Sequence, residues 1–123
     1  MNAERRIFKR MPVEFKAHCI RNSQGTSQEY FLSFAKDISL NGMRLISSKA
    51  VGIGERLTMA LEIPIYFLPL LLYGEIAWIK NAAETRNNLE SGVKFFKMEP
   101  IDNKRLKKYL SSKREEYTVP TNG

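Results

Sequence analysis

The chain has 123 residues, of which 43% are hydrophobic and 27% are charged, and its formal net charge is +7. These values are typical of one soluble globular domain with its own core, and the length excludes two independent cores. The excess of positive charge predicts an anionic partner, such as nucleic acid, a nucleotide or an acidic protein.

The chain contains neither a run of about 18 apolar residues nor an apolar block behind its charged N-terminus, so we expect no membrane span and no signal peptide. Cys19 is the single cysteine. This excludes an internal disulfide and a metal site built from cysteines. A reducing, cytoplasmic location is expected, and Cys19 itself falls on the apolar face of its segment, as a small buried hydrophobe would.

Apolar and polar residues alternate through most of the first hundred residues, which is typical of half-buried β-strands. Val13, Phe15 and Ala17, for example, alternate with charged residues. Turn-forming Asn, Ser, Gly and Pro separate the alternating segments. Strands are expected at residues 13–20, 29–38, 43–48, 56–63, 70–80 and 89–98. Short strands at this spacing are typical of an antiparallel barrel or sandwich, and we interpret them as a closed six-stranded barrel.

The hydrophobic period changes to that of a helix after residue 100. A helix is expected over residues 101–117, with Asp102 as its N-cap. Its apolar face comprises Ile101, Leu106, Tyr109 and Leu110. Lysine and arginine occupy the rest of its surface, which is either simply solvated or in contact with an acidic partner or nucleic acid. The expected fold is therefore mostly β, a six-stranded antiparallel barrel followed by one C-terminal α-helix.

The N-terminal stretch places Arg5, Arg6 and Arg10 ahead of the first strand, with Arg6 and Arg10 four residues apart. Guanidinium groups carry a permanent charge, form paired hydrogen bonds with phosphate, and can grip the O6/N7 edge of guanine or stack on aromatic planes. These residues could wrap an anionic ligand that contains bases. The alternative is a solvated basic end.

The stretch 37–42 reads DISLNG and places Asp37, Ser39 and Gly42 between two expected strands. A carboxylate can accept both the N1–H and the N2 amine of guanine, and a serine hydroxyl can both donate and accept. Gly42 permits either an unusual backbone conformation or a close approach to a ligand. The alternative is an Asx turn, in which Asp37 and Ser39 bind their own backbone.

The two patterns, RxxxR and then DxSxxG on matching elements, resemble those of the PilZ domain family. The resemblance extends over most of the chain and includes GEIAW at 74–78, SGVKF at 91–95 and the closing helix. It implies a six-stranded barrel that binds the bacterial second messenger cyclic di-GMP. No metal or other cofactor is implied, and no catalytic motif predicts an enzyme.

The resemblance also implies roles for individual residues. Arg6 and Arg10 would contact the phosphates and guanine faces, Asp37 and Ser39 the guanine edges, and Gly42 would keep the turn close. An arginine at the position of Arg5 implies an intercalated ligand dimer. Trp78 is a candidate aromatic wall for a guanine, and the alternative is that it packs against the core or the helix.

The expected domain organisation is a flexible arm at 1–11 that becomes ordered on binding, the barrel and helix at 12–117, and a frayed tail at 118–123. Signalling would pass to an unidentified effector, a flagellar, polysaccharide synthase or chemotaxis component, in control of motility, biofilm formation or virulence. No DNA partner is expected. The alternatives are a general single-stranded nucleic-acid-binding barrel and a ligand-independent adaptor. The apolar loop 64–69 either folds onto the barrel or forms a patch for a partner or for self-association.

Overall fold

The computed structural model describes residues 11–22, 28–81 and 88–117. Each expected element is present, and its bounds differ from the expected ones by at most two residues. The elements are β1 (Met11–Asn22), β2 (Gln28–Ile38), β3 (Gly42–Ser47), β4 (Arg56–Leu61), β5 (Leu70–Asn81), β6 (Leu89–Lys97) and α2 (Pro100–Tyr117). Met11 is therefore part of β1 rather than of the expected arm, and it is buried in the core.

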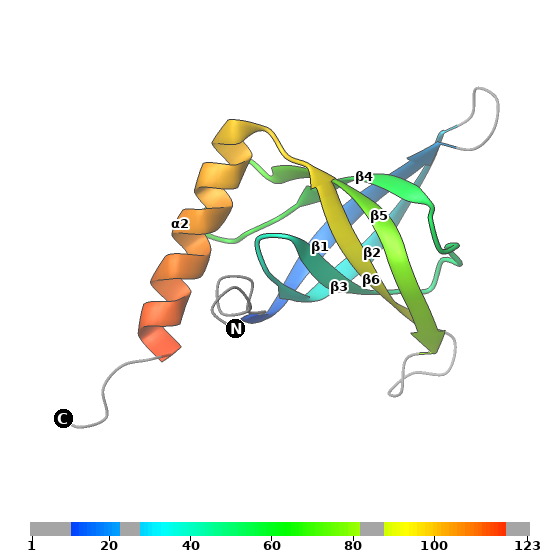
Figure 1. The fold of residues 1–123 in the computed structure, drawn as a ribbon, viewed down its shortest axis with the longest axis horizontal. Helices are drawn as coiled ribbons and strands as arrows, with labels where there is room; N and C mark the ends of the chain where they lie inside the picture. The colour runs from blue at the N-terminus through cyan, green and yellow to red at the C-terminus, as the bar shows by residue number, and fades with distance from the viewer. Residues whose placement is uncertain (1–10, 23–27, 82–87, 118–123) are drawn as a thin grey trace, which may run out of the picture.

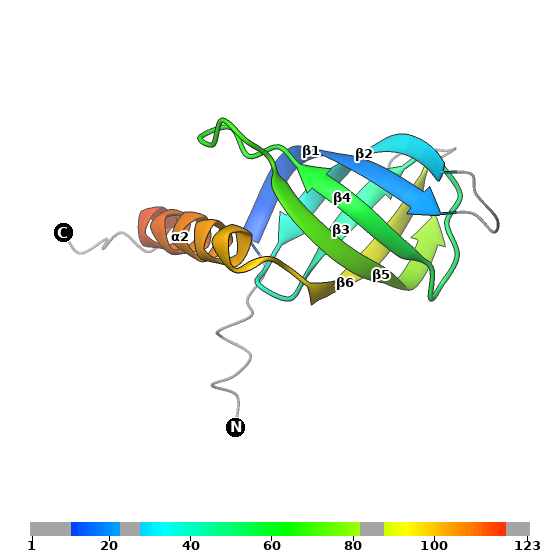
Figure 2. The same ribbon diagram turned by 90° about the horizontal axis from the view of Figure 1, so that it is seen from above.

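The six strands form a closed barrel in the order β1-β2-β3-β6-β5-β4, and β4 closes it by pairing with β1. Every strand pair is antiparallel. Of the two architectures typical of this pattern, the chain adopts the barrel, so the expected mostly β fold with one C-terminal helix is confirmed. Figures 1 and 2 show α2 at one end of the barrel, beside the loop that joins β4 to β5.

The alternating pattern places one face of each strand inside the barrel. Ala17 and Cys19 of β1, Leu45 of β3, Met59 of β4 and Leu72 of β5 are all buried there. Burial raises the pKa of the Cys19 thiol to about 11, and a hydrogen bond with the Ser33 hydroxyl offsets part of this rise. The expectation that Cys19 behaves as a buried hydrophobe is confirmed.

Helix α2 closes one end of the barrel with Leu106, Tyr109 and Leu110, which are buried. The Tyr109 ring meets Phe15 of β1 edge to face, with 5.7 Å between ring centroids. The assignment of Ile101 to this apolar face was wrong, because 65% of its surface is exposed. The hydrophobic periodicity of a helix does not show which of its turns contact the barrel.

The expected N-cap at Asp102 was also wrong. The helix begins at Pro100, a residue suited to the first helical position because it has no N–H to leave unpaired, and Asn103 N donates to Glu99 O (2.9 Å). Asp102 lies inside the first turn, where a negative charge is favourable. Its Oδ1 accepts a hydrogen bond from Arg105 Nη2 (2.6 Å).

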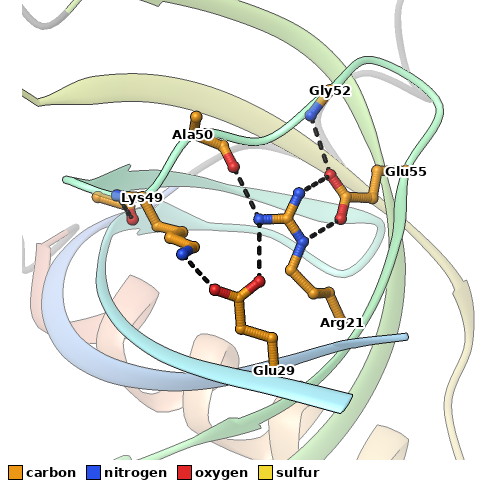
Figure 3. Close-up of polar contacts among 7 residues, drawn as sticks. Arg21, Glu29, Lys49, Ala50, Gly52 and Glu55 are labelled. Atoms are coloured by element: carbon orange, nitrogen blue, oxygen red, sulfur yellow. Dashed lines mark hydrogen bonds and ion pairs between the residues drawn. The ribbon is translucent and has the colours of Figure 1, made fainter. Parts of the chain in front are cut away.

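A polar cluster stabilises the barrel near the ends of β1 and β2 (Figure 3). Arg21 donates from Nε (2.5 Å) and Nη2 (2.9 Å) to the two oxygens of Glu55, and from Nη1 to Ala50 O (2.9 Å). Glu29 lies between Arg21 and Lys49, and the hydrogen bond from Lys49 lowers the pKa of its carboxyl group. The cluster fastens the segment between β3 and β4 to the wall of the barrel.

Candidate functional site

A single row of cross-strand partners contains two of the candidate ligand-binding residues. Pro12 of β1 pairs with Asp37 of β2, Asp37 with Arg44 of β3, Arg44 with Gly92 of β6, and Gly92 with Trp78 of β5. Residues next to them in sequence face the core, and these are Met11, Ile38, Met43 and Val93. Since side chains alternate along a strand, the row lies on the outer face of the barrel.

Arg44 holds together two carboxylates on this face. Its Nε donates to Asp37 Oδ2 (2.8 Å), and its Nη1 donates to Glu90 Oε2 (2.7 Å). The hydrogen bond to Asp37, followed by that to Glu90, raises the pKa of Arg44 above its already high value. The cation therefore fixes the orientation of the Asp37 carboxylate. Lys80 adds a second positive charge, 4.0 Å from Glu90 Oε1.

The DISLNG stretch forms a tight turn between β2 and β3. Ser39 N donates to Gly42 O (2.8 Å), and Ser39 Oγ lies 2.7 Å from Asn41 Oδ1 and accepts from Asn41 N (3.3 Å). Ser39 is only 1% exposed. In this state the Ser39 hydroxyl holds the turn, which is the self-bonded alternative raised from the sequence, whereas the Asp37 carboxylate binds the Arg44 side chain.

Gly42 is needed because β3 and β6 approach closely at this turn. It pairs with Lys94, and a Cβ atom at position 42 would overlap the carbonyl oxygen of Val93. Its φ is not positive, so its role is close approach rather than an unusual backbone conformation. The neighbour it approaches is the backbone of β6. Phe95 N, which donates to Asn41 O (2.9 Å), joins the turn to the same strand.

Trp78 lies flat against the outer face, at a site that only glycine leaves open. A Cβ atom at Gly92 would overlap the Trp78 indole at Nε1 and Cε2, so the indole covers the Gly92 backbone. Trp78 is half-buried and is not part of the core cluster. Lys80 Nζ lies 5.7 Å from the centre of the ring. An aromatic surface thus lies beside the Arg44 network.

A shallow pocket lies on the same outer face, one row further along. It is lined by Glu75, Ala77, Lys94 and Phe96. Lys94 pairs with both Gly42 and Glu75, so the pocket adjoins the turn between β2 and β3. Arg56 borders this pocket, with its guanidinium 4.5 Å from the centre of the Phe96 ring. Together these features make a polar and aromatic surface rather than a deep cavity.

The structure thus brings Asp37, the turn with Ser39 and Gly42, and Trp78 onto one side of the barrel. Arg5, Arg6 and Arg10 lie outside the described residues, although residue 10 is bonded to Met11 at the start of β1. Arg44 was not among the residues predicted from the sequence. The signal was the single charged residue in MRLISS, directly after the DISLNG turn. No group of three or more potential metal ligands occurs in the described part of the chain.

A closed six-stranded antiparallel barrel, with an acidic and hydroxyl-bearing turn at one rim and a closing helix, defines a class of small β-barrel domains. The model of the PilZ domain family matches residues 4–112. The chain belongs to the PilZ domain family. A search of curated protein sequences found no significant match.

Solved structures with similar folds include the Bacillus subtilis inhibitor of motility MotI/DgrA (TM-score 0.72, 13% identity). The aligned region covers 92% of this chain and 52% of the MotI/DgrA chain. The complex of K. pneumonia MrkH with c-di-GMP has a TM-score of 0.70 and 15% identity, with 89% and 52% covered. The PilZ domain of Escherichia coli YcgR with c-di-GMP has a TM-score of 0.63 and 16% identity, with 92% and 94% covered. The chain spans about half the length of the first two structures. At these identities the likeness shows the fold.

Among the described residues, no helix combines the length and the apolar character needed to cross a membrane.

Proposed function

We propose that this chain is a receptor for cyclic di-GMP and binds it across the outer-face row that runs from Pro12 to Trp78. The observation that carries the proposal is the register of this row. It aligns Asp37 and Trp78 with Pro12, near the start of β1, the strand that follows the arginine motif. Membership of the PilZ family supports it, as do the two similar structures that contain c-di-GMP. Asp37 and Trp78 lie three strands apart, about 14 Å at the usual strand spacing.

The roles of the residues follow from their chemistry. Arg6 and Arg10 bind phosphate oxygens and guanine faces through paired hydrogen bonds and stacking. Asp37 accepts from a guanine edge, and Arg44 positions its carboxylate. Trp78 offers an aromatic surface to a base. Ser39 and Gly42 maintain the turn that carries Asp37, and a ligand contact by Ser39 itself requires its hydroxyl to leave the turn.

The signal is the change at the N-terminal arm. Positively charged residues repel one another without ligand and are neutralised by its phosphates, so residues 1–10 become ordered around the bound dinucleotide. The ordered arm, next to β1, is then the surface that an effector protein in the cytoplasm reads. No catalytic step is required for this role.

Calorimetric titration of the full chain with cyclic di-GMP tests the proposal. We expect saturable binding that Arg6→Ala or Arg10→Ala weakens at least about tenfold, because each lost charge-assisted hydrogen bond costs about 1.5–3 kcal/mol. Lys9→Ala, in the same arm but outside the motif, is the matched control and should have a much smaller effect. GTP, cyclic AMP and a single-stranded oligonucleotide are the competing ligands.

The molar ratio from the same titration tests the ligand dimer. A ratio of two for the wild type that falls toward one in Arg5→Ala supports an intercalated pair. The absence of heat and of any chemical-shift change at high micromolar ligand in low-salt buffer contradicts the receptor function. Tighter binding of the oligonucleotide than of the cyclic dinucleotide would favour the nucleic-acid-binding barrel.

A further inference from the structure

The loop between β4 and β5 exposes a group of large apolar side chains to solvent. Phe67 is 98% exposed, and Ile65 and Leu68 are exposed to more than half of their surface. The loop projects from the barrel at the same end as α2 (Figure 2). Three large apolar side chains within four residues, all turned outward, are more than the scattered single hydrophobics of an ordinary surface. The sequence left open whether this loop folds onto the barrel, and most of it does not.

The loop is held in place rather than loose. A β-turn at its start has Pro64 at its second position, and Tyr66 N donates to Ile63 O (2.9 Å). Tyr66 OH donates to Arg105 O of α2 (3.0 Å). Arg105 in return donates to Leu68 O (2.7 Å) and Pro69 O (3.0 Å). The apolar side chains are therefore presented at little cost in conformational entropy.

Helix α2 adds a positively charged flank to the loop. Ile101, Lys104 and Lys108 are exposed, and helical geometry places them on the face next to Arg105, which contacts the loop. The nearby Asp102 carboxylate is buried and is paired with Arg105. The loop–helix patch is defined by its apolar residues Ile65, Phe67, Leu68 and Ile101 and its cations Lys104 and Lys108.

We propose that the loop–helix patch docks this protein on an anionic phospholipid membrane surface, with the Phe67 loop inserted among the lipid headgroups. Apolar side chains flanked by cations are the combination that binds a lipid interface, where both apolar burial and attraction to anionic lipid contribute. This proposal does not depend on the proposed binding of cyclic di-GMP.

The chemistry of the patch favours a membrane over other occupants. Its cations, Lys104 and Lys108, act as mobile point charges suited to a diffuse anionic surface, whereas the neighbouring Arg105 is used within the fold. The apolar side chains stand on a projecting loop, and a lipid surface accepts such a shape without a matching groove. A second copy of this chain is disfavoured, because it would bring like-charged helix faces together and the chain carries a net charge of +7.

Flotation of the full chain with unilamellar vesicles tests the proposal. Vesicles of phosphatidylethanolamine and phosphatidylglycerol are compared with vesicles of phosphatidylcholine, at low and at high salt. We expect binding to the anionic vesicles that weakens as salt rises. Phe67→Ser should reduce it at least about tenfold, and Lys104→Glu with Lys108→Glu should reduce it at least about tenfold, since each lysine contributes about fivefold.

Ile53→Ser is the matched control. Like Phe67, Ile53 is largely exposed (70%), but it lies in the segment between β3 and β4, away from α2 (Figure 1). Its substitution should leave vesicle binding unchanged. Because Phe67 makes so little contact with the rest of the protein, Phe67→Ser should fold as the wild type does, which circular dichroism checks.

A spectroscopic experiment measures insertion directly. In the double variant Phe67→Trp, Trp78→Phe, the introduced indole is the only one in the chain, and vesicles with brominated acyl chains should quench its fluorescence. Equal binding of wild type and Phe67→Ser, or no binding to anionic vesicles in low salt, would overturn the proposal. Another result would also overturn the proposal: no vesicle binding, together with a concentration-dependent dimer or a complex with one protein partner that Phe67→Ser abolishes.

Discussion

Arg44 shows how one side chain can set the chemistry of the candidate site. Its guanidinium group donates hydrogen bonds to Asp37 on β2 and to Glu90 on β6. The first carboxylate is half-buried and the second is buried. Without the cation, two negative charges would face each other across β3 with much of their water removed. Arg44 therefore both stabilises this part of the barrel and positions the Asp37 carboxylate that we assign to the guanine edge.

Arg44→Leu is expected to lower the free energy of unfolding by about 1.5–3 kcal/mol, the contribution of a hydrogen bond to a charged group, and to weaken cyclic di-GMP binding. Arg44→Lys keeps the charge without the fork and should be intermediate in both. Chemical denaturation and calorimetric titration measure the two effects.

Adding Glu90→Gln to Arg44→Leu separates the two roles. It removes one of the two carboxylate charges that have lost Arg44, so stability should recover in part while ligand binding stays weak. If the double variant binds as tightly as the wild type, Arg44 does not position Asp37.

At the scale of elements, the contact between β3 and β6 depends on Gly42. The β6 backbone at Val93 occupies the space that a side chain at position 42 would need. A rigid backbone cannot yield as a flexible side-chain end can. The glycine of the DxSxxG pattern is therefore required by strand packing, whether or not a ligand is bound.

Gly42→Ala is expected to destabilise the protein by about 1–3 kcal/mol, as overpacking in a well-packed region does. Gly52→Ala is the matched control, since a Cβ atom there would meet no atom within 4 Å, and its effect should stay within about 0.5 kcal/mol. Thermal and urea denaturation of both variants provide the comparison. Equal stability of Gly42→Ala and the wild type would show that β6 can move away.

The elements themselves could be predicted from the sequence, because alternation and turn residues are local signals. The role of Arg44 could not be predicted in this way, because its partners Asp37 and Glu90 are 7 and 46 residues away in sequence and only strand register brings them together. The covering of Gly92 by Trp78 is likewise a cross-strand contact. Asp102 was misplaced for a local reason, since the helix starts two residues earlier, at a proline.

At the scale of the whole molecule, barrel and helix are joined at several points. Phe15 and Tyr109 pack together at the end of the barrel, and Arg105 and Tyr66 join α2 to the β4–β5 loop. A strand in a closed barrel cannot separate without breaking pairs with two neighbours. This arrangement favours cooperative unfolding of all described elements together.

Urea titration should therefore give one transition by two probes. Trp78 fluorescence reports on β5 and β6, and far-ultraviolet circular dichroism reports on α2 as well as the strands. We expect the two curves to coincide within error. Loss of the helix signal at a clearly lower urea concentration would show that α2 is a separate unit attached to a stable barrel.

Closure of the barrel also limits how any protein can recognise this domain. Each of the six described strands has a neighbour on both sides along part of its length, so no strand has an open edge from end to end. Residues 28–33 of β2 and 76–81 of β5 pair on one side only. An effector that added a strand of its own would have only these short one-sided segments to pair with. Most of the surface available for recognition therefore consists of side chains on the barrel wall, the connecting segments and the helix, where single substitutions can tune affinity without disturbing the hydrogen-bonded framework.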